Sequence, residues 1–162
     1  MIHLIVGNTG SGKTTYSNTL KEKLGGIVFT IDTWNKALFL KDKNDSDGID
    51  WFLERIERSE SIMQNLILQL ETRNVDSILD LGLSKFSHRE KFRNFAKEHS
   101  LKIKLHFLDI PKEIRKKRIV ERNTTKGETF EFVVSDADFE FMEVWFETPT
   151  ETEILGGVRE LK

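Results

Sequence analysis

The stretch GNTGSGKT at residues 7–14 constrains the fold of this chain more than any other segment. An apolar run ends at Gly7, two glycines are separated by four residues, and Lys13 and Thr14 open a polar, helix-like segment. This is the spacing of a loop that wraps around phosphate groups. Glycine has no Cβ atom, so the backbone can turn tightly and approach an anion. The chain therefore needs a buried strand before this loop and a helix after it.

The residues of this loop predict a triphosphate site. Backbone N–H groups from Thr9 to Thr14 can converge on an anion at the positive end of the helix dipole. Lys13 can place its charge on the β and γ phosphates, and the Thr14 hydroxyl can bind Mg²⁺. The residues that we expect to bind the nucleotide here are Asn8, Thr9, Gly10, Ser11, Gly12, Lys13, Thr14 and Thr15. Chance glycines between a strand and a helix are the alternative, but such a pattern arises in roughly one chain of this length in a hundred.

Composition narrows the class of protein further. A chain of 162 residues is long enough for one domain with its own core, so we expect a single domain over residues 1–162. A net charge of −2 argues against a general nucleic-acid binder. The absence of cysteine excludes disulfides, thiolate metal sites and a thiol nucleophile. No apolar run approaches the roughly 20 residues that span a bilayer, and residues 2–6 have the pattern of a strand rather than a signal peptide. We therefore expect a cytoplasmic protein with no membrane partner.

The hydrophobic periodicity predicts strands that alternate with helices. The expected strands are residues 2–6, 27–30, 75–81 and 101–108, with a further one in the tail 152–162. The expected helices are residues 13–24, 35–40, 49–73, 87–99, 111–122 and 135–146. This order predicts a parallel sheet with helices on both faces, a three-layer α/β/α fold. A polar loop at residues 123–133 would form part of a lid, at about residues 115–133, that excludes water when nucleotide binds.

Asp32, Asp80 and Asp109 lie at or just beyond the carboxyl ends of three predicted strands. In parallel sheets the ligand binds at the carboxyl ends of the strands, so Gly7, Asp32 and Asp80 should converge on one cleft. Asp32 can accept the proton of a substrate hydroxyl or hold Mg²⁺ through water, although an aspartate here could instead cap a helix. Asp80 can direct Mg²⁺, hydrogen-bond the acceptor or cap a turn. Trp34 either walls the acceptor site or packs in the core, and Arg89 either faces the cleft or lies on the surface.

A strongly basic helix carries the second signal. Arg115, Arg118 and Arg122 fall three and four residues apart, so they share one helical face. Arginines at this place can neutralise the charge that develops on a transferring phosphoryl group. A solvated charged face is the alternative. We expect at least one of the three to contact phosphate, with Arg118 and Arg122 ahead of Arg115 and Arg118 acting in catalysis.

Together, these motifs resemble those of the small P-loop kinases with AAA-type ATP-binding domains, close to zeta toxins, chloramphenicol phosphotransferase and the kinase part of polynucleotide kinases. The matching pieces are residues 7–14, 31–34 and 79–82, Arg89, Arg115, Arg118, Arg122 with Asn123, and residues 146–149. The resemblance implies an adenylate-kinase-like sheet with a small lid, ATP as donor, and Mg²⁺. It also implies that Asp32 is the catalytic base, that Lys13 and Thr14 serve phosphate and metal, and that Arg118 and Arg122 serve lid and nucleotide.

Three functions are compatible with these residues. The first is an ATP-dependent kinase that phosphorylates a hydroxyl of a small molecule, with Asp80 and Thr14 at the metal and Asp32, Trp34, Asp80 and Arg89 near the acceptor. The second is a nucleotide or polynucleotide 5′-hydroxyl kinase, which is less favoured. The third is an ATP-binding switch or ATPase without an acceptor. ATP is expected rather than GTP, because no Asn-Lys-x-Asp motif occurs at a suitable place. We expect a monomer or a weak dimer.

Overall fold

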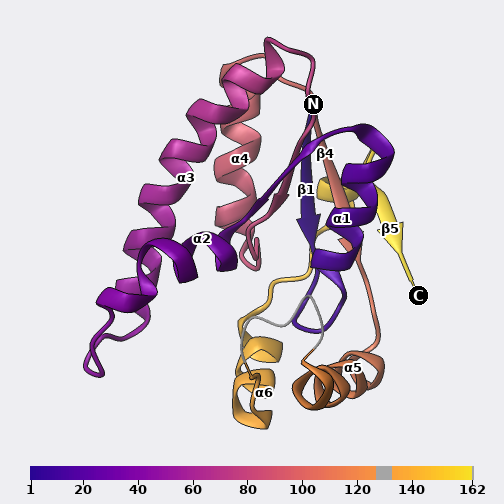
Figure 1. Ribbon diagram of the computed structural model, residues 1–162. Helices are drawn as coiled ribbons and strands as arrows, with labels where there is room; N and C mark the ends of the chain where they lie inside the picture. The colour runs from indigo at the N-terminus through magenta and orange to yellow at the C-terminus, as the bar shows by residue number, and fades with distance from the viewer. Residues whose placement is uncertain (127–132, 162) are drawn as a thin grey trace.

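The computed structural model describes residues 1–126 and 133–161. Within these ranges, five parallel strands form one sheet in the order β2-β3-β1-β4-β5 (Figure 1). The strands are β1 (Ile2–Val6), β2 (Ile27–Thr30), β3 (Ser77–Asp80), β4 (Ile103–Leu108) and β5 (Val158–Glu160). The sheet register places Ile2 of the central strand opposite Ser77 on one side and Ile103 on the other.

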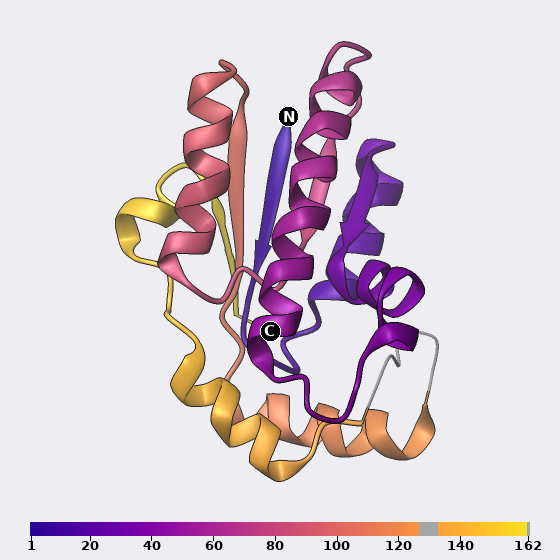
Figure 2. The ribbon, with the colours of Figure 1, turned by 90° about the vertical axis from the view of Figure 1, so that its left-hand side faces the viewer.

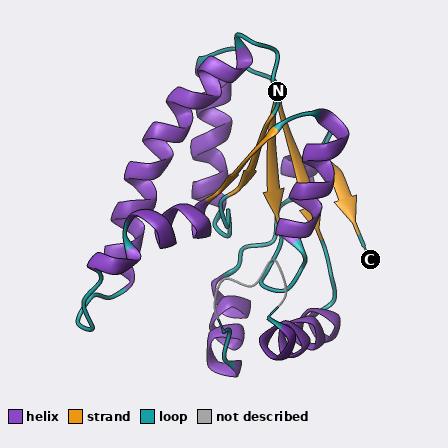
Figure 3. Ribbon diagram, viewed as in Figure 1, coloured by secondary structure: helices purple, strands orange, loops and turns teal. Residues whose placement is uncertain are grey.

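Helices cover both faces of the sheet, which confirms the predicted three-layer α/β/α fold (Figure 3). They are α1 (Lys13–Leu24), α2 (Ile31–Leu38), α3 (Ile49–Glu71), α4 (Phe86–Glu98), α5 (Lys112–Thr125), α6 (Asp136–Trp145) and α7 (Glu151–Ile154), with a short 3₁₀ turn η1 (Leu40–Asp42). Helices α3 and α4 lie on one face, and α1 lies on the other (Figure 1). No helix in the described ranges combines the length and the apolar character that crossing a bilayer requires.

Alternate side chains of β1 enter two separate cores, because successive residues of a strand point to opposite faces. Leu4 belongs to the larger core, where it is buried together with Met63 of α3 and Phe92 of α4. Ile5 belongs to the smaller core, against which Leu20 of α1 packs. All five residues of β1 are buried, as expected for the middle strand of a covered parallel sheet. The strand is thereby fixed, and with it the start of the loop at Gly7.

Several element boundaries differ from the sequence predictions. The second helix begins at Ile31 rather than residue 35, since the last residue of β2, Thr30, serves directly as its N-cap. The basic helix continues to Thr125, where Lys126 in a left-handed conformation ends it. The tail contains the expected strand but also α7, which the sequence analysis missed. This short helix carries a capping box between Thr150 and Glu153.

Helices α5 and α6 lie beyond the carboxyl ends of β1 and β4, in the region toward which the strand arrows point (Figures 1 and 2). Ile119, Val134 and Phe139 form a small apolar cluster that joins the two helices. Part of the expected lid, residues 127–132, lies outside the described residues. The described remainder, α5 together with Val133 and Val134, stands over the edge of the sheet where the predicted cleft should be.

Candidate active site

A cavity of about 710 Å³ opens at the carboxyl edge of the sheet, between the glycine-rich loop, the start of α2, α5 and α6. Gly7, Asp32 and Asp80 all line it, so the three strand ends converge as the parallel topology requires. The other predicted site residues in its lining are Thr9, Gly10, Gly12, Lys13, Thr14, Thr15, Arg118 and Arg122.

The loop itself depends on glycine at two points. Gly10 and Gly12 have φ angles of +81° and +92°, a left-handed conformation that residues with side chains rarely adopt. A Cβ atom on Gly10 would lie 2.7 Å from the backbone oxygen of Arg115, so any larger residue would push α5 away from the loop. Close contact between the loop and α5 is therefore built into the fold.

Lys13, Thr14 and Asp80 form a connected group in the floor of the cavity. The ammonium of Lys13 donates a hydrogen bond to the Gly7 carbonyl at 2.9 Å, and the Thr14 hydroxyl donates to Oδ2 of Asp80 at 2.9 Å. Burial lowers the pKa of Lys13, and the nearby carboxylates of Asp80 and Asp32 oppose that shift. Burial raises the pKa of Asp80, against the opposing effects of Lys13 and Thr14. A hydroxyl and a carboxylate side by side are the hard oxygen ligands that Mg²⁺ prefers.

Asp32 lies in the first turn of α2 and lines the same cavity as Arg118 and Arg122 of α5. It is not the helix cap, because Thr30 occupies that position. The negative charge of Asp32 acts to raise the pKa of Lys13 and also that of Arg122. Its carboxylate is thus within electrostatic reach of both cationic groups of the site.

Arg118 and Arg122 contribute the cationic wall of the cavity. One guanidinium nitrogen of Arg118, Nη1, donates to the backbone oxygen of Ser11 at 3.2 Å, which places this side chain against the loop. The Nε atom of Arg122 is buried and has no hydrogen-bond partner among the described residues. Burial lowers the pKa of Arg122, and Asp32 opposes this shift. A buried guanidinium N–H beside a glycine-rich loop is suited to a phosphate oxygen.

Arg115 does not line the cavity, although it shares a helical face with the other two arginines. Its guanidinium is buried and binds the Glu143 carboxylate, with Nη2 2.8 Å from Oε2. Its Nε atom also donates to the Ile110 carbonyl at 2.8 Å. These contacts use its donors within the protein, which is consistent with its place behind Arg118 and Arg122 in the order expected from sequence.

Arg89 and Trp34 are also placed away from the cavity. The Arg89 side chain is 1% exposed and donates from Nε to Glu153 at 2.6 Å and from Nη1 to the Glu147 carbonyl at 2.9 Å. It fastens the tail of the chain to α4 and is neither at the cleft nor on the surface, the two places expected from sequence. Trp34 packs against the larger core, with its ring centroid 6.3 Å from that of Phe29.

Asn8 and Ser11 belong to the loop, but they are buried and do not line the cavity. The amide nitrogen of Asn8 donates to Oε1 of Glu143 at 2.6 Å, and its amide oxygen accepts the backbone N–H of Thr9 at 2.7 Å. A Cβ atom on Gly7 would lie 2.5 Å from Oγ of Ser11, which shows how closely this hydroxyl covers the first glycine. Both side chains support the loop from within.

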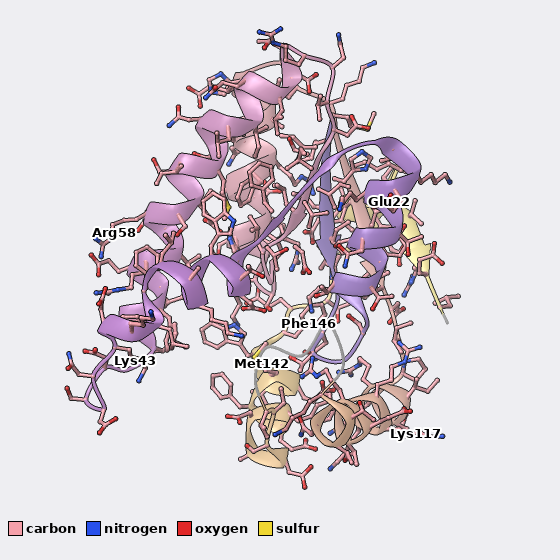
Figure 4. The ribbon with its side chains drawn as sticks, in the orientation of Figure 1. Glu22, Lys43, Arg58, Lys117, Met142 and Phe146 are labelled. Atoms are coloured by element: carbon pink, nitrogen blue, oxygen red, sulfur yellow. The ribbon has the colours of Figure 1, made fainter. Side chains whose placement is uncertain are left out.

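Sequence reasoning missed the residues that complete the cavity. Asp138, Phe141 and Met142 of α6 line it, together with Ser84 in the turn after β3. Figure 4 places Met142 on the part of α6 that faces the sheet. The helix was predicted, but its pattern does not say which face meets the cavity.

A parallel sheet in this strand order, with a glycine-rich loop from β1 to a helix that begins Lys-Thr, defines a P-loop nucleoside-triphosphate fold. Residues 2–149 match the family described as an AAA domain, and the chain belongs to that family.

Solved structures share the fold at low sequence identity. Kti12 of Chaetomium thermophilum, in complex with ADP-AlF3, superposes with a TM-score of 0.71 at 14% identity, covering 100% of this chain and 88% of that one. The APS kinase CysC of Mycobacterium tuberculosis, in complex with AMPPNP and APS, has a TM-score of 0.65 at 16% identity, with 99% and 87% coverage.

A curated relative resembles this chain at the sequence level. It is a UPF0200 protein of Saccharolobus islandicus, 27% identical over 122 residues, an alignment that covers 74% of this chain and 63% of the relative. The chain therefore spans less than two thirds of the length of that relative.

Proposed function

We propose that this chain transfers the γ-phosphate of ATP to a hydroxyl group of a small molecule, with Mg²⁺ as cofactor. One observation carries the proposal: a P-loop lysine, two arginines and two aspartates on different elements line one cavity. A phosphoryl transfer site needs positioning, positive charge and one group to accept a proton. The kinase and ATP-analogue complexes among proteins of the same fold add support by analogy.

The chemistry of the site fits a magnesium nucleotide. Thr14 and Asp80 present a hydroxyl and a carboxylate that already share a 2.9 Å hydrogen bond, the ligand types that hold Mg²⁺ beside phosphate. The buried Nε–H of Arg122, which has no hydrogen-bond partner within the described part of the chain, suits a phosphate oxygen. When bound, Mg²⁺ would neutralise charge on the β and γ phosphates.

Each remaining residue has one role in this proposal. Lys13 binds the β and γ phosphates as a fixed positive charge. Arg118 and Arg122 stabilise the charge that develops on the transferring group. Asp32 accepts the proton of the acceptor hydroxyl, and its exposed position at the start of α2 leaves it accessible to a molecule in the cavity.

The test is transfer of label from γ-labelled ATP to pooled metabolites, antibiotics and 5′-hydroxyl oligonucleotides. We expect transfer to a small molecule, and Asp32→Asn should lower its rate by about 10²–10⁴-fold, as for loss of a general base. The matched control is Asp50→Asn, since Asp50 is an exposed aspartate in the first turn of α3 and does not line the cavity. Equal transfer by wild type and Asp32→Asn would show that Asp32 is not the base.

The other functions correspond to other outcomes of the same assay. Label on oligonucleotides alone would identify a polynucleotide kinase. Binding of MgATP in calorimetry without transfer to any acceptor would favour a nucleotide-binding switch or ATPase. Tighter binding of GTP than of ATP in the same calorimetry would overturn the proposed donor.

A further inference from the structure

We propose that Glu143 is a positioning residue for the phosphate loop. Together with Arg115, it binds Asn8 and the backbone oxygen of Thr9 and thereby sets the direction of the loop's backbone N–H groups. This inference rests on the proposed function only in that the loop binds phosphate. Glu143 lies on α6, and neither its position in the chain nor a motif connects it with residues 7–14. Three contacts establish the connection.

Glu143 is the point at which three elements meet. Its Oε1 atom accepts from the Asn8 amide at 2.6 Å, and both of its oxygens accept from Arg115 of α5. Arg115 in turn donates to the backbone oxygen of Thr9 at 3.2 Å. The Glu143 side chain is 18% exposed and that of Arg115 is 7% exposed, so water competes little for these bonds. The Arg115 guanidinium lowers the pKa of Glu143, which keeps the carboxylate charged.

These contacts act on the backbone that faces the cavity. In a planar trans peptide the C=O and the following N–H point in opposite directions. Arg115 draws the Thr9 oxygen toward α5, so the N–H of Gly10 is directed away from α5, and Gly10 lines the cavity. Asn8 fixes the preceding peptide, because its Oδ1 accepts the Thr9 N–H and its C=O accepts the Ser11 N–H at 3.0 Å. Preorganised amides bind an anion without reorganising.

The neighbouring acid on the same helix provides an internal control. Glu140 lies one turn before Glu143 and also pairs with α5, through Lys112 at 2.7 Å and Lys116 at 4.0 Å. Its side chain is 52% exposed, and both of these contacts are with α5 rather than with the loop. Both acids therefore join α6 to α5, but only Glu143 also reaches the phosphate loop.

The experiment measures the binding of tripolyphosphate and MgADP by calorimetry. We expect Glu143→Gln to weaken both ligands by about 10-fold or more, because it removes the charge that holds Arg115 and Asn8. Glu140→Gln should change either affinity by less than about 2-fold, as expected for an exposed ion pair. Equal weakening by the two variants, or unchanged affinity in Glu143→Gln, would overturn the inference.

A second variant distinguishes the role of Glu143 in positioning the loop from its role in joining α5 to α6. Asn8→Ala removes the direct contact between Glu143 and the loop but leaves the Arg115–Glu143 pair, and its bond to the Thr9 oxygen, intact. We expect it to weaken tripolyphosphate as well, and the double variant with Glu143→Gln should lose less than the sum of the two, since both break one connection. Strict additivity would contradict a shared connection. Because tripolyphosphate binding needs no acceptor and no proton transfer, the result stands apart from whether Asp32 supports transfer.

Discussion

The four arginines that the sequence offers as candidates for the cleft or for phosphate separate into two pairs in the structure. Arg89 and Arg115 are buried in ion pairs with glutamates, whereas Arg118 and Arg122 line the cavity. All four are arginines on helices that border the sheet. The difference between the two pairs therefore lies in the residues that pack against each arginine. Where a neighbouring segment supplies a buried carboxylate, an arginine fastens two elements together. Arg118 and Arg122 instead present their charge to the cavity that they line.

The largest effect should follow from removing an arginine of the first pair. Arg89→Met leaves the Glu153 carboxylate, whose side chain is 2% exposed, without its partner. Breaking a buried ion pair from one side costs about 3–5 kcal/mol, so the free energy of unfolding should fall by that amount in urea denaturation. Glu153→Gln in the same background should recover part of the loss. Unchanged stability in Arg89→Met would remove the distinction between the two pairs.

The same substitution in the second pair should lower the rate of phosphoryl transfer and leave the stability unchanged. Arg122→Met removes a cation whose burial disfavours its charge, so the melting temperature should not fall. Phosphoryl transfer should decrease by about 10²–10³-fold, the effect of losing one donor to developing charge. Steady-state kinetics beside thermal denaturation tests both statements. A destabilised variant with normal kcat would mean that Arg122 fastens the fold and does not serve the site.

The sequence predicts the residues that line the cavity better than it predicts the partners of the two buried arginines. The loop, the strand ends and the convergence of Asp32 with Asp80 follow from local patterns and one topological rule. The partners of Arg89 and Arg115 do not, because Glu153 is 64 residues and Glu143 is 28 residues away along the chain. Spacing places residues on a helical face, but it does not specify what packs against that face.

Some of the missed structure was nevertheless present in the sequence. Thr150 and Glu153 have the spacing of a capping box, which identifies the start of α7. The early start of α2 had no comparable signal, since β2 passes into it at Thr30 without a turn. Local chemistry can therefore locate a capped helix, whereas a boundary set by the sheet requires the tertiary structure.

Burial also acts on two histidines, His3 and His106, by disfavouring their protonated form. His106 bonds to His3 at 2.9 Å and to the Tyr16 hydroxyl at 2.9 Å. Burial lowers the pKa of His106 to about 4, with the charges of His3 and Lys104 adding to the effect. Since the unfolded value is about 6.5, the unfolded chain binds more protons between these pH values.

Acid should therefore destabilise the protein in a defined range. Stability is fully present above pH 6.5 and should fall by about 2 kcal/mol as the pH approaches 4.5. His106→Gln should flatten this dependence in urea titrations at successive pH values, and His99→Gln, at an exposed histidine, should not. A wild-type slope retained in His106→Gln would mean that other groups, and not this buried base, bind the protons.

The smallest effect belongs to a cation that is exposed. Lys112 of α5 pairs with Glu140 at 2.7 Å, and the two side chains are 43% and 52% exposed. Water and salt screen such a pair, and holding two long side chains together opposes its small attraction. Lys112→Met should therefore leave the melting temperature and the transfer rate unchanged within error, in contrast with the same substitution at Arg89 or Arg122. A melting temperature lowered as far as in Arg89→Met would show that burial does not decide which cations hold the fold together.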